Sequence, residues 1–152
     1  MGPGEHEPVA EQKIKTVKER VRVFEHKLPF VMTVLLLVWC VYFCVGRLNM
    51  QFTSTHPQGP PPRELFTGWK VNANIDLRHG FAECAQCKVR DTNNSMQART
   101  GGCTLLAPTG NVTGSSHMLH LETGKVIIGD QYTVIPMPDV VVTAINDQAA
   151  KA

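Results

Sequence analysis

The 152-residue sequence has little net charge and an odd number of cysteines, and both exclude whole classes of protein. Lys and Arg number 15 against 13 Asp and Glu, and the net charge of +2 excludes a nucleic-acid binder that its charge alone would reveal. Of the five Cys, two lie in an apolar run, which argues against a disulfide-dense secreted miniprotein. Phosphate-binding glycine loops, nucleophile elbows and internal repeats are also lacking. The hydrophobic fraction of 43% is enough to build a core and excludes wholesale disorder.

Residues 9–26 have the apolar spacing of an amphipathic helix that opens after Pro8. Its apolar face recurs every four and three residues: Ala10, Ile14, Val17, Val21 and Phe24. A second face carries charge at spacings of four, three and four: Glu11, Lys15, Lys18 and Arg22. The spacing alone is typical of a solvent-exposed face, with a Glu11–Lys15 pair worth a few tenths of a kcal/mol.

An uncharged run from Leu28 to Val45 reaches the lower length limit of a membrane-spanning helix, which needs about 20 residues. Residues 8–27 hold six Lys or Arg and residues 47–66 hold two, which would leave the N-terminus cytoplasmic. The competing interpretation is a helix buried in a protein core, with Pro29 near its start and Gly46 and Arg47 just past its end. Both interpretations follow from these residues.

The remainder of the chain predicts a small β-rich domain. A Pro-rich linker in residues 51–63 separates residues 1–50 from residues 64–138, and residues 139–152 form a short helix and tail, with Asp139 as N-cap. Turn residues bound five predicted strands, 80–88, 103–106, 117–121, 125–128 and 132–135. Five short strands at this spacing favour a small barrel.

Two weaker motifs lie in this region. Cys84 and Cys87 have half the spacing of a zinc site, and the nearest further ligands are His79, Cys103, His117 and His120, none in a second pair. We therefore favour ordinary strand cysteines over zinc. Asn93 and Asn111 begin glycosylation sequons, which matter only if residues 51–152 are lumenal.

Read end to end, residues 2–150 resemble the integrase region of the Pol polyprotein of copia-type LTR retrotransposons. GPGEHEPVAEQKIKTVKERVR is similar to the end of the integrase catalytic core, and LPFVMTVLLLVWCVYFCVGRLNM to its next helix. PPRELFTGWKVNANIDLRHGFAECAQ, NNSMQARTGGCTLLAPTGNVTGS and HMLHLETGKVIIGDQYTVIPMPDVV are similar to the segments beyond the core. The order of these blocks, with the PRELFTG, PTGN and PMPD strings, carries the resemblance.

The resemblance gives the charged helix face a functional meaning. Integrases bind two metal ions through two Asp and one Glu, and Glu11 occupies the position of that Glu. Lys15 and Lys18 match the DNA-contacting positions, and Arg22 continues the face. The resemblance also implies an SH3-like DNA-binding barrel, in which the available cations are Arg63, Lys70, Arg78, Lys88 and Arg99. Trp69 stands where the family usually has a basic residue.

The resemblance therefore implies an α+β chain made of two helices from an RNase-H-like integrase core, a linker, a five-stranded SH3-like barrel and a short C-terminal helix. Both catalytic Asp and the upstream zinc module are absent, so we expect no enzyme and no cofactor, although the intact family uses Mg²⁺. The two helices would also lack the central sheet on which they normally pack.

The expected partners are nucleic-acid phosphates, bound weakly, and full-length integrase. The expected location is the nucleus or cytoplasm. The alternative remains a single-pass membrane protein with a cytoplasmic N-terminus and a lumenal β-rich domain.

Overall fold

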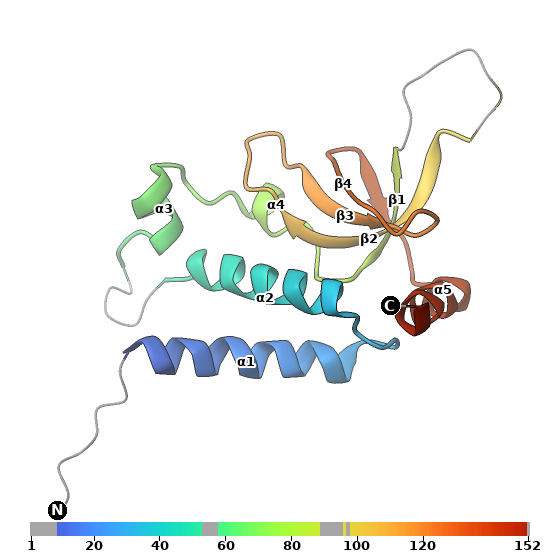
Figure 1. Ribbon diagram of the computed structural model, residues 1–152. Coiled ribbons are helices and arrows are strands. Elements are labelled where there is room, and N and C mark those ends of the chain that lie inside the picture. Colours follow the sequence, from blue (N-terminus) through green and yellow to red (C-terminus); the bar gives the residue numbers. More distant parts are fainter. Residues whose placement is uncertain (1–8, 53–57, 89–95, 97, 152) are drawn as a thin grey trace, which may run out of the picture.

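The computed structural model describes residues 9–52, 58–88, 96 and 98–151, and their fold is α+β (Figure 1). The helices are α1 (Val9–Lys27), α2 (Val34–Asn49), α3 (Pro62–Thr67), α4 (Ala73–Asp76) and α5 (Asp139–Lys151). The strands are β1 (Cys84–Lys88), β2 (Thr100–Pro108), β3 (Ser116–His120), β4 (Val126–Gly129) and β5 (Tyr132–Val134). All five predicted strands and the three long helices are thus present, and the α+β class is confirmed.

Helices α1 and α2 lie side by side with opposite directions, and α2 lies between α1 and the sheet (Figure 1). The apolar run does not form one helix. Helix α1 ends at Lys27, residues 28–33 make the connection, and α2 begins after Thr33, whose side chain accepts a hydrogen bond from the Leu36 amide at 3.2 Å. In the part of the chain that the structure describes, no helix combines the length and apolar character needed to cross a bilayer.

The predicted bounds of the second helix, 28–45, are therefore wrong at both ends. Pro29 lies in the connection because proline fits poorly inside a helix. At the other end α2 continues past Gly46, because Arg47 in its last turn donates hydrogen bonds to the backbone carbonyls of Asp76 and His79. These contacts come from a segment about 30 residues away in sequence, so local propensity does not reveal them.

The strands form one antiparallel sheet in the order β4-β3-β2-β1-β5. The turn between β3 and β4 closes with the His120 amide bonded to the Lys125 carbonyl at 2.9 Å, and Gly124 adopts the positive φ of 64° that this turn needs. This turn separates β3 from β4 where the predicted strands 117–121 and 125–128 leave a gap.

Strands β4 and β5 lie at opposite edges of the sheet and do not pair with each other, so the sheet is open. The prediction of a closed barrel is wrong. Strand β5 is only three residues long, and Pro136 follows it closely. Helices pack on one face of the sheet and bury its apolar surface, which closing the sheet into a barrel would otherwise bury.

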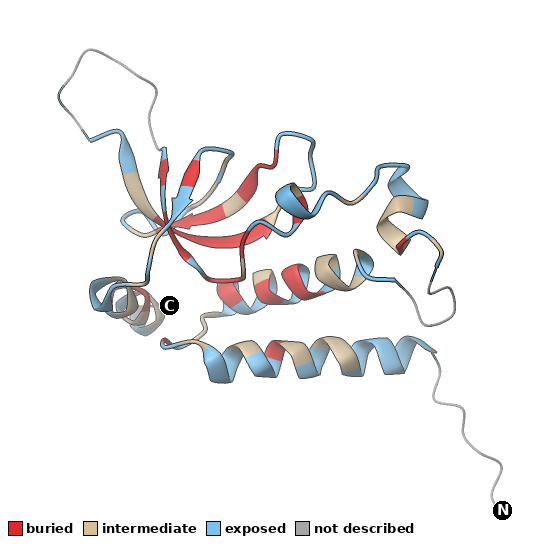
Figure 2. Cartoon of the chain, turned by 180° about the vertical axis from the view of Figure 1, so that it is seen from behind, coloured by how far each residue is buried: buried red, intermediate tan, exposed pale blue. Residues whose placement is uncertain are grey.

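The core joins the helices to the sheet. Phe24 of α1, Phe43 of α2 and Phe81 before β1 form a cluster whose ring centroids lie 5.5 to 5.9 Å apart. Leu36, Leu106 and Ile145 bring α2, β2 and α5 into the same buried cluster. Figure 2 shows buried residues concentrated in the sheet and along α2. The expectation that the first two helices have nothing to pack on is therefore wrong, because this sheet receives them.

Candidate nucleic-acid interface

The charged face predicted on the first helix lies on the solvent side of α1. Its residues Glu11, Lys15, Lys18 and Arg22 are all exposed, and with Ile14 and Glu19 they line a shallow depression of about 300 Å³. The charged face points to solvent because Val17, Val21 and Phe24, on the opposite side of α1, pack in the core. We call Lys15, Lys18 and Arg22 the α1 basic face.

Helix α1 also concentrates the positive charge of the molecule. It contains six Lys or Arg and three Glu, a net charge of +3, whereas the full chain carries +2, so the rest of the chain carries −1. The cations of the α1 basic face recur on successive turns, and each has an ammonium or guanidinium group that can contact a phosphate oxygen. An extended polyanion is the chemical class of ligand that such a row fits.

Two of the cations expected to bind DNA in the strand-rich region, Arg63 and Arg78, instead make contacts that stabilise the fold. The side chain of Arg63 is only 17% exposed. Its Nη1 lies 2.8 Å from Asp76 Oδ1 in an ion pair whose geometry is not that of a hydrogen bond. Its Nη2 donates a hydrogen bond to the Gly110 carbonyl at 3.0 Å. Arg78 stacks over the Tyr132 ring at 4.5 Å and donates to the Tyr132 carbonyl at 3.3 Å. Both guanidinium groups are engaged within the protein.

The other three predicted cations, Lys70, Lys88 and Arg99, are exposed but do not join the α1 basic face. Lys88 ends β1 and is in register with Thr100, the first residue of β2, and Arg99 immediately precedes Thr100, so both cations belong to the end of the β1–β2 pair where residues 89–99 connect the strands. That end lies away from α1 (Figure 1). Lys70 lies between α3 and α4. The structure therefore brings together the helix cations and leaves the remaining ones dispersed.

Among the described residues that line the depression, Glu19 is the one carboxylate besides Glu11. Among the described residues, no three or more His, Cys, Asp or Glu side chains gather into a set that could hold a metal ion. A two-metal phosphoryl-transfer site needs several carboxylates around the metal pair.

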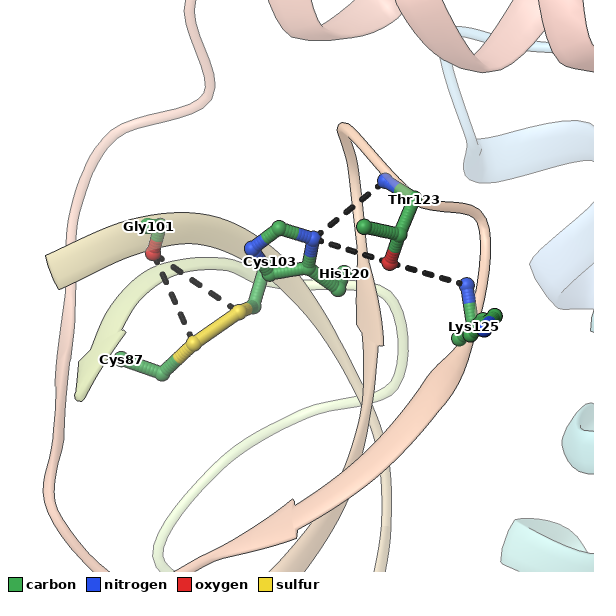
Figure 3. Close-up of a disulfide and its surroundings, with 6 residues drawn as sticks. All are labelled: Cys87, Gly101, Cys103, His120, Thr123 and Lys125. Atoms are coloured by element: carbon green, nitrogen blue, oxygen red, sulfur yellow. Dashed lines mark hydrogen bonds between the residues drawn. A yellow bond between two sulfur atoms is a disulfide. The ribbon is translucent and has the colours of Figure 1, made fainter. Parts of the chain in front are cut away.

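The cysteines of the suspected half zinc site have different surroundings. Cys87 forms a disulfide with Cys103 of the adjacent strand β2 (Figure 3), whereas Cys84 is a free thiol. Burial raises the pKa of Cys84, so its thiol stays protonated and is a poor metal ligand. Both cysteines lie in β1, as predicted, but the disulfide of Cys87 was not predicted from the sequence.

The three histidines considered as zinc ligands each have another contact. His120 Nδ1 accepts a hydrogen bond from the Thr123 amide at 3.3 Å (Figure 3). The His117 ring lies 4.6 Å from that of Trp39. His79 belongs to the buried polar chain described below.

Of the two sequons, Asn93 lies outside the described residues. Asn111 is exposed in the β2–β3 turn. Its Oδ1 accepts hydrogen bonds from the Ser115 amide and the Thr113 hydroxyl, both at 3.0 Å, so the side chain stabilises the turn.

Sequence reasoning missed a buried polar chain that ties three parts of the fold together. The Tyr132 hydroxyl lies 3.3 Å from Ser116 Oγ, Ser116 Oγ lies 2.8 Å from His79 Nε2, and His79 Nδ1 lies 2.8 Å from the Gly80 carbonyl. The carbonyl can only accept, so Nδ1 carries the proton and Nε2 accepts from Ser116. Desolvation by burial lowers the pKa of His79, which favours this neutral form. All three side chains of this hydrogen-bonded series are buried, so the series stabilises the fold, and Ser116 is not open to a substrate.

Comparisons with known proteins give no relative: no protein-family model, curated protein or solved structure matches this chain.

Proposed function

We propose that this chain derives from the integrase region of a copia-type retrotransposon polyprotein and that it binds nucleic-acid phosphates weakly and in a salt-sensitive manner. The block order of the sequence supports the origin. The α1 basic face supports the activity, and it is the one observation that carries this part of the proposal: three exposed cations lie on successive turns of the most positive element of the chain.

The proposed binding mode is electrostatic and independent of base sequence. Lys15, Lys18 and Arg22 contact phosphate oxygens along one strand or across a groove edge. Glu11 and Glu19 lie in the same depression and repel the polyanion, so the affinity stays low. Lys88 and Arg99, at the far end of the β1–β2 pair, form at most a second and separate contact.

Catalysis is not part of the proposed function. In the related integrases Glu11 would share two Mg²⁺ ions with two Asp, and in the proposal those Asp belong to a part of the parent polyprotein that this sequence does not include. As a retroelement product the chain would act in the nucleus or cytoplasm, alone or beside full-length integrase.

The test compares two charge-matched triple variants in fluorescence-anisotropy titrations of a labelled DNA duplex at low salt. The first, Lys15→Gln/Lys18→Gln/Arg22→Gln, removes the α1 basic face. The second, Lys13→Gln/Lys27→Gln/Lys125→Gln, removes the same charge from exposed positions outside it. We expect the first variant to lose most of the affinity and the second to keep most of it. Equal losses in both variants would show that net charge alone is responsible, and no binding by the unchanged chain would end the proposal.

A further inference from the structure

The outer face of α2 is apolar and exposed, unlike that of a typical surface helix. Val34, Val38, Val41 and Val45 follow each other at spacings of four, three and four residues and are between 40% and 79% exposed. Leu37 and Tyr42 flank them and are exposed as well. We call these six residues the α2 stripe. Such a stripe exceeds the scattered apolar residues that are normal on a protein surface.

The α2 stripe carries no charge. The single charged residue of α2 is Arg47, which turns inward: its guanidinium stacks on Phe43 at 4.8 Å and donates to the Asp76 and His79 carbonyls. Nucleic acid would require cations at the contact, and helices that rest on a lipid surface usually carry Lys or Arg beside their apolar residues. The chemistry of the stripe therefore fits another apolar protein surface better than either.

The apolar surface continues beyond the helix. A groove of about 570 Å³ lies between α2, α3 and the β2–β3 turn, and Tyr42 and Val45 of the stripe line one side of it. Phe66, on α3, lines the other side and is 93% exposed. At these exposed fractions, the stripe and Phe66 together leave roughly 700–800 Å² of residue surface accessible, backbone atoms and the Tyr42 hydroxyl included, against about 800 Å² for one partner's share of a standard protein interface.

The spacing of the stripe fits another helix as its partner. Apolar residues at alternating intervals of four and three form the seam along which two helices interlock side chains, and branched residues such as Val suit such a seam. A stripe that is uncharged along its whole length is complementary to itself. Two copies related by a two-fold axis would place the same residues on both sides of the contact.

We propose that the α2 stripe binds the α2 stripe of a second copy of this chain, giving a two-fold symmetric homodimer with the adjoining groove and Phe66 at its rim. This interface is separate from the α1 basic face, so the nucleic-acid binding proposed above can fail without affecting it.

The test is the mass of the full chain by sedimentation equilibrium from about 1 to about 100 μM, a range that suits an interface of modest area. We expect the mass to rise with concentration from that of one chain to that of two. In Val38→Glu/Val41→Glu, which places charges at exposed positions in the middle of the stripe, we expect a single chain throughout. The matched control Val9→Glu/Val23→Glu, on exposed positions of α1, should behave as the unchanged chain does.

Two results would overturn the proposal. One is an unchanged chain that stays a single copy over the whole range, a result that does not depend on any variant folding correctly. The other is a dimer that survives Val38→Glu/Val41→Glu while circular dichroism shows the variant to be folded. Co-sedimentation with phosphatidylcholine–phosphatidylglycerol vesicles is measured in parallel, and a single-copy chain that binds them through the stripe would identify lipid as the occupant instead.

Discussion

His79 makes the stability of the fold dependent on pH. Desolvation by burial holds its pKa below the ordinary value of 6.5. The hydrogen bond to the Gly80 carbonyl and the carboxylate of Glu83 oppose this effect, whereas the positive charges of Arg47 and Arg78 add to it. A folded-state pKa below the unfolded one means that the unfolded chain binds protons more readily on acidification. The contribution of His79 is therefore fully present above pH 6.5 and is lost as the pH falls through and below that value.

We predict that the free energy of unfolding, from urea titrations between pH 8 and pH 5, falls on acidification and that His79→Gln flattens this fall. Burial also lowers the pKa of His117, so part of the pH dependence should remain. His26 is exposed, and His26→Gln is the matched control that should leave the curve unchanged. If the free energies of unfolding of the unchanged protein and of His79→Gln ran parallel with pH, this account of the buried His79 side chain would be contradicted.

Glu11 is predicted to oppose nucleic-acid binding in this chain. Its exposed carboxylate lies in the depression beside Lys15 and Lys18, where it repels phosphate. Glu11→Gln should tighten DNA binding a few-fold at low salt and should leave the response to Mg²⁺ unchanged, as measured by anisotropy with and without the metal. A loss of Mg²⁺-dependent binding in the variant would mean that Glu11 holds a metal ion after all.

The charged face of α1 was predictable and the His79 chain was not, for a physical reason. Glu11, Lys15, Lys18 and Arg22 share a face because helix periodicity alone brings them together. His79 and Ser116 are 37 positions apart in sequence and meet only when the segment before β1 packs beside β3. No local pattern marks either residue, so this contact required the three-dimensional structure.

The two faces of helix α2 should contribute differently to the free energy of unfolding. Substitutions of the adjacent aromatic residues Phe43 and Tyr42, one on each face, test this difference. Phe43 is buried in the three-ring cluster, whereas Tyr42 is 61% exposed on the α2 stripe. Phe43→Ala should lower the free energy of unfolding by about 3–5 kcal/mol, because it removes a buried ring and leaves a cavity. Tyr42→Ala should cost clearly less, and urea unfolding of the two variants measures the difference. Equal losses of unfolding free energy in the two variants would mean that Phe43 does not lie on the core-facing side of α2.

The disulfide between Cys87 and Cys103 joins β1 to β2 across 16 positions of sequence. By the entropy of closing a loop of about that length, it should stabilise the fold by about 3 kcal/mol. We expect a thiol reductant to lower the free energy of unfolding by about this amount, and Cys87→Ala/Cys103→Ala to be insensitive to the reductant. In a reducing nucleus or cytoplasm the pair would be open, so the reduced value is the one relevant to the proposed location. A reductant effect of equal size in the double variant would assign the stabilisation to another cause.

The strands were largely predictable because turn residues bound them on both sides. Thr-Gly turns at residues 109–110 and 123–124 separate strands as expected, and each observed strand overlaps its prediction. The glycine pair at 101–102 does not end a strand: both residues lie inside β2, where they pair with β1. The short helices α3 and α4 were missed because four to six residues show no clear periodicity. The open sheet was also missed, since closure depends on how β4 and β5 lie relative to one another and not on their sequences.

At the scale of the whole molecule, the described residues pack the predicted helices α1 and α2 onto a five-stranded sheet. Leu36 and Phe43 bury the inner side of α2 in a core shared with the strands. This packing leaves two chemically distinct surfaces on the helices: the α1 basic face, with charge for a polyanion, and the α2 stripe, without any. The two proposed partners follow from that separation.

The measurement that tests the central claim most directly is the dependence of DNA binding on salt. Three phosphate contacts from the α1 basic face should make the logarithm of the association constant fall linearly with the logarithm of salt concentration, with a slope of about −2 to −3. The triple variant Lys15→Gln/Lys18→Gln/Arg22→Gln should reduce the steepness by about 1 for each cation removed. A slope near zero, or no detectable binding at the lowest salt, would contradict the account of this chain as an electrostatic nucleic-acid binder.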